Sequence, residues 1–466
     1  MKDNVRKLFI VFLLGFLALI TQLAYWQIIA AASLQANPAN QRAWEVEEEV
    51  WRGGIYDRYG EILAASQYNG DNLQSRVYPL GEKAVHIVGY NSRRYGKSGL
   101  ESSYNGELLG ITQEDSIKNL VYSVLGRRKR GQDLILTLDK RLQEVAYKAL
   151  GSHRGSIVVI NPQTGEVLAL VSKPSFSPNE LKTQWARLNT DKNSPLLNRA
   201  TQGLYPPGSI LKVLIAAAAL EKGSTNQEEI FNCPGYILIN GRKLSCYHQE
   251  AHGKINLAQA MEVSCNVTFA KLGMRLGSHG LNDYLEKMER LGNRRVGIFL
   301  AESSLAKGKN LSANGLAERA IGQGEVLTTP FYMASLASAI ANHGTLMRPY
   351  LVSEIRSSSG KITHKNLPEE GNQVFSSTVA ESVAKMMEKV VREGTGKNAQ
   401  IPSWEIAGKT GTAENPHGKP HAWFIGFAPS QNPQLAIAVV VENGGTGGTV
   451  AAPIAREIFL NALENK

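Results

Sequence analysis

The stretch Tyr205-Pro206-Pro207-Gly208-Ser209-Ile210-Leu211-Lys212 opens a run of apolar residues that continues to residue 220. Proline and glycine end the preceding structure and serine is favoured where a helix begins, so the pattern predicts a loop followed by a buried helix. Ser209 and Lys212, three residues apart, would share one face of that helix. Burial lowers the pKa of a lysine, and a neutral amine beside a hydroxyl is a base beside a nucleophile. The stretch therefore indicates acyl-transfer chemistry.

The alternative is purely structural: Ser209 caps the helix and the ammonium of Lys212 extends to solvent. The pattern Ser-x-x-Lys also begins at Ser304, Ser358 and Ser382. Those copies lie in a polar stretch, a Ser/Gly-rich turn and an amphipathic helix. The serine at position 209 is the one that follows a Pro-Pro-Gly turn and precedes an apolar helix.

Two further motifs follow in order, Ser264-Cys265-Asn266 and Lys409-Thr410-Gly411-Thr412. The first comes after a stretch expected to be helical, residues 256–263. The second lies in an expected edge strand, residues 405–413, ahead of two strands at residues 422–428 and 434–442. The three motifs resemble the signature of penicillin-binding proteins and class A β-lactamases, with Cys265 where that signature has an aspartate.

The N-terminus predicts a membrane anchor. Residues 8–41 carry no formal charge, and residues 8–32 are long enough to cross the hydrocarbon core of a bilayer. Lys2, Arg6 and Lys7 precede the apolar stretch, which favours a cytoplasmic N-terminus. The alternative is a cleaved signal peptide, since the unbroken apolar core is short and Ala30-Ala31-Ala32 could serve a peptidase. The length of the apolar stretch favours the uncleaved anchor, and either interpretation exports the rest of the chain.

Length and charge narrow the class of protein. The 466 residues are enough for two or three domains, and the net charge of +10 is spread along the chain. The one dense basic cluster, Arg127-Arg128-Lys129-Arg130, is interpreted as a solvated loop, with attraction to an anionic envelope surface as the alternative. No nucleic-acid-binding module is indicated.

The order of the expected elements predicts an α+β fold. An expected hairpin at residues 156–172 precedes a largely helical middle, residues 212–338, and two strands and a helix at residues 451–463 end the chain. Strands at both ends with helices between them suggest one antiparallel sheet packed by helices. The expected parts are a cytoplasmic tail (1–7), a transmembrane anchor (8–32), a β-rich pedestal (33–140) and a catalytic domain (141–466).

Beyond the three motifs, the chain resembles a class B penicillin-binding protein over nearly its whole length. Residues 37–42, 52–60 and 99–101 resemble pieces of that family's pedestal, and residues 321–324 and 423–426 resemble pieces of its catalytic domain. Taken alone, residues 52–64 predict a hairpin, and Gly99-Leu100-Glu101 predicts a loop. Residues 33–140 are too few for the glycan-polymerising domain of the class A relatives.

The resemblance implies an activity and partners. The activity is that of a D,D-transpeptidase, which cross-links peptidoglycan stem peptides ending in D-Ala-D-Ala, is acylated by β-lactams and needs no cofactor or metal. The enzyme would sit in the cell membrane with its catalytic domain outside. Its partner would be a membrane-embedded glycan polymerase of the shape, elongation, division and sporulation family. The motifs fit elongation, division and sporulation alike.

The resemblance also implies a role for each motif residue. Ser209 is the acylated nucleophile and Lys212 takes its proton. Ser264 relays a proton to the leaving amine, and Asn266 holds a substrate amide.

The third motif would bind the substrate's end. Lys409 and the hydroxyl of Thr410 would hold the terminal carboxylate. The backbone N–H groups of Ser209 and Thr412 would form the oxyanion hole. Gly411 would let the substrate peptide lie against the strand edge as an added strand.

The three cysteines allow two interpretations. Cys233 and Cys246 flank an expected hairpin at Asn240-Gly241, and two cysteines in one exported loop favour a disulfide. The alternative is a zinc site made by Cys233, Cys246, His252 and Cys265, although their spacing matches no compact zinc finger. The disulfide is preferred because the domain is expected to be exported, and disulfides form outside the cytoplasm.

Two other functions remain as rivals. A serine β-lactamase would share the three motifs but would have no use for a pedestal. A β-lactam sensor or a scaffold of the wall-building complex would not need the complete catalytic set.

Overall fold

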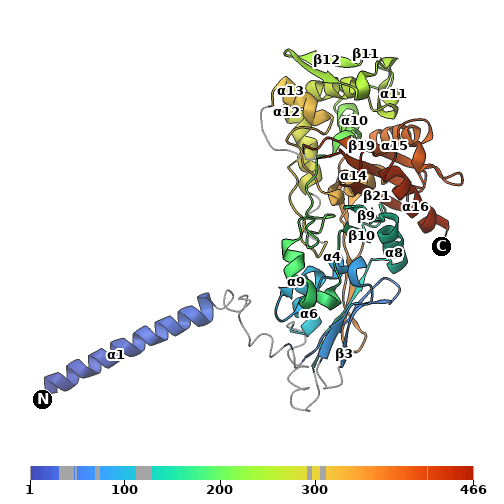
Figure 1. The fold of residues 1–466 in the computed structure, drawn as a ribbon. Coiled ribbons are helices and arrows are strands. Elements are labelled where there is room, and N and C mark those ends of the chain that lie inside the picture. Colours follow the sequence, from blue (N-terminus) through green and yellow to red (C-terminus); the bar gives the residue numbers. More distant parts are fainter. Residues whose placement is uncertain are drawn as a thin grey trace.

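The computed structural model describes residues 2–30, 47, 50–68, 74–111, 129–290, 296–304, 311–416 and 418–464. Figure 1 shows a helix at the N-terminus, then a β-rich pedestal, then a larger mixed domain in which the chain ends. Residues 37–42 lie outside the described residues, as do Arg127 and Arg128 of the basic cluster. The other half of that cluster forms strand β7 (Lys129–Arg130), so the loop interpretation is wrong there.

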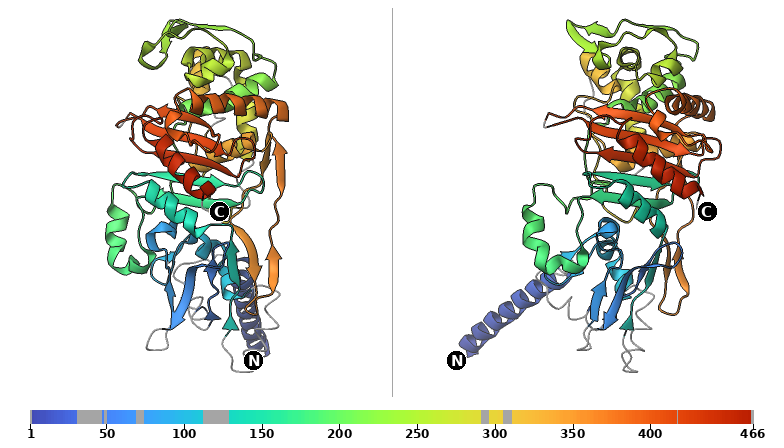
Figure 2. Two further views of the ribbon diagram at one scale, coloured as in Figure 1. Left: turned by 90° about the vertical axis from the view of Figure 1, so that its right-hand side faces the viewer. Right: turned by 45° about the vertical axis from the view of Figure 1, so that its right-hand side comes forward.

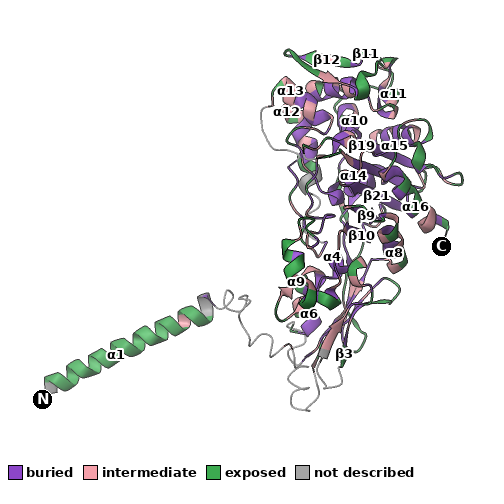
Figure 3. Cartoon of the chain, viewed as in Figure 1, coloured by how far each residue is buried: buried purple, intermediate pink, exposed green. Residues whose placement is uncertain are grey.

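Helix α1 (Lys2–Ala24) forms from the charge-free stretch, and the π-helical turn η1 (Tyr25–Ile29) continues it. Asp3–Gln27 has a mean hydropathy of 2.3 and is not buried against any other described part of the protein. Figure 3 shows α1 exposed along nearly its whole length. Among the described residues this is the one helix long and apolar enough to cross a membrane, which agrees with an anchor.

The pedestal is built on a six-stranded sheet in the order β17-β16-β8-β2-β3-β4. Its strands are β2 (Ile55–Tyr56), β3 (Ile62–Tyr68), β4 (Gln74–Val77), β8 (Asp133–Leu136), β16 (Val352–Arg356) and β17 (Ile362–Lys365). The predicted hairpin is confirmed, because β2 pairs antiparallel with β3. Strands β16 and β17 come from the far half of the chain, which the sequence did not predict, and β16 pairs antiparallel with β8. Figure 2 shows these two strands, in orange, beside the pedestal.

Short elements complete the pedestal. They are β1 (Val50–Trp51), which pairs with β7, the hairpin β5 (Asn91–Ser92) and β6 (Gly96–Lys97), and the helical turns η2 (Gly81–Lys83), α4 (Val85–Val88), α5 (Gly99–Ser103) and α6 (Asn105–Leu109). The segment predicted from sequence to be a loop begins α5 instead. The reason is Glu101, which is fully buried and accepts hydrogen bonds from Arg52 Nε at 2.6 Å and Arg76 Nε at 2.7 Å. Losing Glu101 would leave the buried side chains of Arg52 and Arg76 without their shared carboxylate, so these contacts fix the segment.

The catalytic domain contains the predicted antiparallel sheet, in the order β10-β9-β21-β20-β19. Its strands are β9 (Gly155–Ile160), β10 (Val167–Lys173), β19 (Ala407–Ala413), β20 (His421–Ala428) and β21 (Leu435–Val441). Helices α8 (Lys140–Ala149) and α16 (Ala451–Glu464) cover one face, and α10 (Lys212–Glu221) and α14 (Pro330–Ala341) cover the other. Because both faces are covered, every residue of β21 is buried. Strand β19 lies at the sheet edge, as predicted.

The middle of the chain is helical, as expected, except for an insert of short strands. The remaining helices are α9 (Leu181–Thr190), α11 (Leu257–Glu262), α12 (Asn266–Arg290), α13 (Ala313–Ala320) and α15 (Ser377–Arg392), with the 3₁₀ turns η4 (Pro178–Glu180), η5 (Gly208–Leu211), η6 (Tyr247–Gln249) and η7 (Lys397–Ala399). The short strands are β11 (Phe231–Cys233), β12 (Tyr236–Ile239), β13 (Arg242–Ser245), β14 (Gly253–Ile255), β15 (Thr345–Met347) and β18 (Glu370–Gln373). The predicted hairpin is present, since β12 pairs with β13 across Asn240 and Gly241, both with positive φ.

Candidate active site

The loop before Ser209 is fixed on both sides. Tyr205 exchanges two backbone hydrogen bonds of 2.9 Å with Thr328, and its hydroxyl donates to Glu442 Oε1 at 2.7 Å. The indole N–H of Trp423 on β20 donates to Pro206 O at 3.1 Å. These contacts join the loop to the central sheet, so the residues that follow start from a fixed position.

Ser209 lies in the 3₁₀ turn η5 and not at the cap of helix α10. The helix itself begins at Lys212. Ser209 is partly exposed and lines a large cleft in the catalytic domain, whereas the residues on either side of it are buried. The capping alternative is therefore wrong, and the hydroxyl of Ser209 is available to a substrate.

Lys212 is fully buried, so it does not reach solvent as the structural alternative required. Its Nζ donates to Ser264 O at 2.7 Å, Ser264 Oγ at 3.2 Å and Asn266 Oδ1 at 2.6 Å. Desolvation by burial lowers the pKa of Lys212 to about 8. An amine with that pKa can accept a proton near neutral pH.

Ser264 has an unusual backbone conformation. It directly follows α11 and its C-cap residue Val263, and its φ of 57° lies in the left-handed region. A non-glycine residue there costs about 1–2 kcal/mol. The turn brings the backbone carbonyl and the hydroxyl of one residue to the amine of Lys212, which accounts for the strain being retained.

Strand β19 brings the third motif to the same cleft. Thr410 and Thr412 line it, while Lys409 is fully buried and donates to Thr410 O at 3.0 Å. Burial, and then repulsion from the charge on Lys212, lowers the pKa of Lys409 well below its ordinary value. The hydroxyl of Thr410 bonds to that of Thr395 at 2.6 Å, a partner that no motif in the sequence indicates.

Gly411 lies in tight surroundings within the protein itself. A Cβ at this position would lie 3.0 Å from Ile210 Cγ2, 3.1 Å from Pro207 O and 3.1 Å from Trp423 Cβ. The missing side chain therefore also makes room for the turn that carries Ser209, in addition to the role toward a substrate peptide that the sequence predicts. Gly322 has a similar role, because a Cβ there would lie 2.0 Å from Gly208 O.

The cleft has a volume of about 980 Å³. Of the residues predicted from sequence it is lined by Ser209, Ser264, Asn266, Thr410 and Thr412, with Lys212, Lys409 and Gly411 in the wall behind. The lining also includes residues to which the sequence analysis gave no role, among them Tyr247, His248, Thr395, Asn398 and Thr446. They come from the 3₁₀ turns η6 and η7 and from segments between the regular elements, which tertiary structure brings together, so no local pattern marks them.

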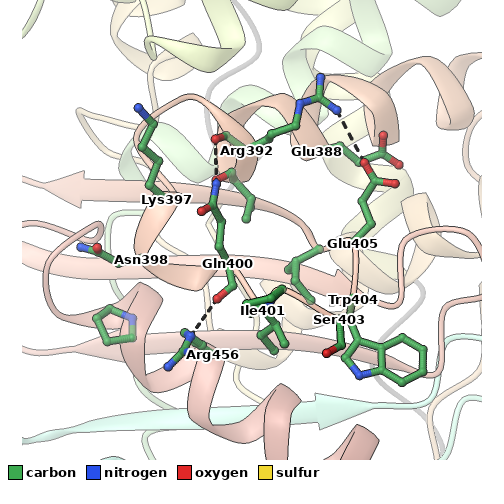
Figure 4. A pocket seen from close by; sticks show the side chains of 14 residues that line it. Glu388, Arg392, Lys397, Asn398, Gln400, Ile401, Ser403, Trp404, Glu405 and Arg456 are labelled. Carbon is green, nitrogen blue, oxygen red and sulfur yellow. Dashed lines mark hydrogen bonds and ion pairs between the residues drawn. The ribbon is translucent and has the colours of Figure 1, made fainter.

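A second cavity, of about 930 Å³, lies where α15 ends and α16 begins. Figure 4 shows its lining, in which Arg456 Nε donates to Gln400 O at 2.7 Å and Arg392 lies 3.6 Å from Glu405. It contains none of the predicted site residues, and it shares Asn398 with the cleft. We assign the chemistry to the cleft, where the three motifs meet.

Among the described residues, the other Ser-x-x-Lys copies do not form a comparable site. Ser382 is half-buried on α15, and its hydroxyl donates to Thr378 O at 2.7 Å within its own helix. Ser358 lies in a turn, and Ser304 is buried with its hydroxyl bonded to Glu325 O at 3.2 Å. Lys307, the partner of Ser304 in the pattern, lies outside the described residues.

The three cysteines are free, so the structure does not contain the preferred disulfide. Cys233, Cys246 and Cys265 are buried and come together with His252 beside the cleft. This group is the one set of metal-binding side chains found among the described residues.

Comparison with known proteins identifies the family. A family model described as the penicillin binding protein transpeptidase domain matches residues 155–460, and one described as the penicillin binding protein A dimerisation domain matches residues 52–134. The peptidoglycan D,D-transpeptidase PbpA of Mycolicibacterium smegmatis is 34% identical, with 99% of each chain covered. Stage V sporulation protein D of Bacillus subtilis is 32% identical over 83% of this chain and 64% of its own. The chain belongs to the class B penicillin-binding protein family.

Solved structures agree with this assignment. Penicillin-binding protein A from M. tuberculosis, as an imipenem acyl-enzyme complex, superimposes with a TM-score of 0.84 at 33% identity, covering 90% of this chain and 99% of that one. Pseudomonas aeruginosa PBP2 in complex with WCK 5153 gives a TM-score of 0.76 at 31% identity, covering 88% and 95%.

Proposed function

We propose that this chain is a membrane-anchored peptidoglycan D,D-transpeptidase that acts through an acyl-enzyme on Ser209. The observation that carries the proposal is the bonding of Lys212 Nζ to Ser264 and Asn266 in a cleft that Ser209 and strand β19 also line. The family supplies the activity: curated relatives are named D,D-transpeptidases, and several related structures are described as β-lactam acyl-enzyme complexes.

The acylation step follows from this arrangement. Ser209 Oγ attacks the carbonyl carbon of the penultimate D-alanine while Lys212 Nζ takes its proton. The oxyanion that forms is held by the backbone N–H groups of Ser209 and Thr412. When the intermediate collapses, the C–N bond to the terminal D-alanine breaks, and the leaving nitrogen receives a proton through Ser264 Oγ, which is bonded to Lys212.

The second half-reaction reverses these roles. The amine of an acceptor stem peptide attacks the ester carbonyl, loses a proton to the base and releases Ser209 as a free hydroxyl. A β-lactam acylates Ser209 by the same first step, but its leaving nitrogen stays tethered within the opened ring. The adduct therefore persists where the D-alanine of the natural substrate would depart.

The buried lysine of β19 accounts for recognition of the substrate's end. Before substrate binds, burial and the proximity of Lys212 both disfavour a charge on Lys409. An incoming carboxylate would favour that charge and would accept hydrogen bonds from Lys409 Nζ and the hydroxyl of Thr410. The negative charge of the terminal carboxylate thus favours the protonated form of Lys409, which in turn binds that carboxylate.

The test distinguishes a transpeptidase from a β-lactamase. Fluorescent penicillin should label the protein in a one-to-one ratio, and the adduct should map to the peptide containing Ser209. Nitrocefin should give a stoichiometric burst followed by slow turnover. Sustained rapid hydrolysis would instead assign the protein to the hydrolases.

A pH profile tests the role of Lys212. Since burial lowers the pKa of Lys212 to about 8, the neutral amine is the minority form at pH 6 and the main form at pH 9. The rate constant for acylation should therefore rise with pH by about tenfold per unit below the apparent pKa and level off above it. Stopped-flow acylation between pH 6 and 9.5 measures this. A rate that falls across the same range would contradict the role of Lys212 as base.

The proposal extends to topology and partners. It comprises a cytoplasmic tail (1–7), one membrane span (8–32), a pedestal (33–140, with β16 and β17 added to its sheet) and an external transpeptidase domain (141–466). Family membership supports a glycan polymerase of the shape, elongation, division and sporulation family as its membrane partner.

Reporter fusions test the orientation. Because Lys2, Arg6 and Lys7 precede the span, alkaline phosphatase fused after residue 466 should be active and a cytoplasm-dependent reporter inactive. The reverse pattern would contradict the orientation. Edman sequencing or mass analysis of the mature protein distinguishes an intact N-terminus from signal cleavage.

A further inference from the structure

Four side chains from separate elements converge next to the catalytic cleft. Cys233 ends strand β11, Cys246 follows β13, His252 precedes β14, and Cys265 joins α11 to α12. Their ligand atoms all lie within 4.8 Å of one another. The separation is 3.6 Å between the sulfurs of Cys233 and Cys246, 3.8 Å between those of Cys246 and Cys265, and 3.3 Å from the sulfur of Cys233 to His252 Nδ1.

These separations match the edges of a tetrahedron around one metal ion. Zinc binds thiolate sulfur at about 2.3 Å and imidazole nitrogen at about 2.0–2.1 Å, which places two sulfurs about 3.8 Å apart and a sulfur about 3.5 Å from a nitrogen. A disulfide would need the sulfurs at about 2.05 Å. Bridging Cys233 and Cys246 would also leave Cys265 and His252 without a role. Three thiolates and one imidazole are a donor set that zinc prefers over oxygen-seeking cations.

The surroundings are those of a built site. The residues at 233 and 265 have no exposed surface, and Cys246 is only 4% exposed. Cys265 precedes the first residue of α12, and its sulfur accepts hydrogen bonds from Thr268 N at 3.5 Å and Thr268 Oγ1 at 3.3 Å. Donors of this kind stabilise a thiolate and orient it toward a metal.

The insert that carries three of the ligands has little core of its own. Residues 231–255 form two separate two-stranded sheets, β11 with β14 and β12 with β13. A two-stranded hairpin is marginally stable in water unless something else holds it. A metal bound by Cys233, Cys246 and His252 of the insert and by Cys265 would attach the insert to the start of α12.

The fourth ligand lies in the catalytic motif itself. Cys265 is flanked by Ser264 and Asn266, which hold the amine of Lys212. The amide of Asn266 in turn donates to Ser245 O at 2.8 Å, and Ser245 precedes the ligand Cys246. The ligand Cys265 is therefore adjacent in sequence to both residues that hold Lys212, and the ligand Cys246 is adjacent to Ser245, which holds Asn266.

We propose that Cys233, Cys246, His252 and Cys265 bind one structural zinc ion, and that this ion fixes the Ser264-Cys265-Asn266 segment against Lys212. Cys246 and His252 line the cleft, but the proposed role of the ion is to hold the catalytic segment in place, so its ligands act as positioning residues. The metal site stands on geometry alone, and its effect on acylation rests on the function proposed above.

Metal content is the first test. Full-length protein purified in detergent without added metal or chelator should contain about one zinc per chain by elemental analysis. Zinc removal should expose three titratable thiols, and cobalt(II) added to the apoprotein should give the visible bands of a tetrahedral thiolate complex. A Cys233–Cys246 link in non-reducing peptide maps, or three thiols with no bound metal, would overturn the proposal.

Variants separate the metal from the fold. His252→Ala should lose zinc, whereas His252→Cys should keep it through a fourth thiolate. His279→Ala, which changes an exposed histidine on α12, should retain full occupancy and serves as the matched control. Loss of zinc from His279→Ala, or its retention by both His252→Ala and Cys233→Ser, would overturn the assignment of ligands.

Acylation tests the positioning role. Chelation of the wild-type protein should slow labelling by fluorescent penicillin about 10–100-fold, as expected for a shift of the catalytic segment, and added zinc should restore it. His252→Cys should label at a rate near that of wild type. Unchanged labelling after complete zinc removal would refute the positioning role. Zinc bound by a protein whose Ser209 is never acylated would refute only the proposed function.

Discussion

Replacing Ser209 with alanine should abolish covalent labelling by penicillin while the protein stays folded. The hydroxyl is the attacking atom in the proposed mechanism, so its loss should reduce acylation by about 10⁴-fold or more. Ser209 lies in the turn η5, is partly exposed and does not cap α10, so the fold should lose little. Mass mapping of the labelled protein and thermal unfolding of both proteins measure the two effects.

Variants of Lys212 complete this test. Lys212→Ala should reduce acylation severely, and Lys212→Arg should fail as well, because an arginine does not release its proton near neutral pH. The two losses should be far from additive in the Ser209→Ala/Lys212→Ala double variant, since the pair acts as one unit.

Matched controls come from the other copies of the pattern. Ser382→Ala and Ser358→Ala, both outside the cleft, should label as wild type. Stoichiometric labelling of Ser209→Ala with the adduct mapped to another serine would refute the mechanism.

Gly322→Ala should reduce acylation about 100-fold without touching any side chain of the three motifs. A Cβ at Gly322 would lie 2.0 Å from Gly208 O, and Gly208 N donates to Gly322 O at 2.9 Å. The methyl group can fit only if the turn that carries Ser209 moves. A displacement of about 1 Å of a reacting group costs about that factor in rate.

The control for this variant has the same backbone strain in open space. Gly151 has a φ of 57°, close to the 74° of Gly322, and a Cβ at Gly151 would meet no atom within 4 Å. Gly151→Ala should therefore carry a similar left-handed penalty of about 1–2 kcal/mol and still be acylated at the wild-type rate. Equal acylation rates for the two alanine variants would show that the contact with Gly208 has no effect on catalysis.

Much of the fold follows from local patterns in the sequence. The apolar run after Lys212 predicts a buried helix, and the strand-like segments at residues 156–172, 405–413, 422–428 and 434–442 predict the antiparallel sheet. The Asn240-Gly241 hairpin is likewise confirmed, because only residues that tolerate positive φ suit its turn. The helix and the hairpin depend on neighbours close in the sequence, whereas the pairing of β9 with β21 in the sheet joins segments far apart in the chain.

The features that the sequence did not reveal depend on distant contacts. Glu101 determines a helical turn because two distant residues reach it, Arg52 from the segment between β1 and β2 and Arg76 from β4. Gly411 leaves room for Ile210 and Pro207, which lie about 200 residues earlier in the chain. The sequence favoured a Cys233–Cys246 disulfide because exported proteins commonly contain disulfides. It could not show that His252 lies next to Cys233, which only the structure reveals. Short motifs identify such residues, but the reason for each appears only in three dimensions.

The strands β16 and β17 have a mechanical consequence. They extend from the catalytic domain to the pedestal, where β16 pairs with β8 and β17 pairs with β16. The pedestal sheet therefore contains strands from both halves of the chain. A rotation imposed on the pedestal by a membrane partner would therefore pass to the transpeptidase domain through two covalent routes, at residue 140 and at residues 347–374, and would not be absorbed by a single hinge. A chain shortened to residues 141–466 would leave the edge of β16 unpaired and open to aggregation.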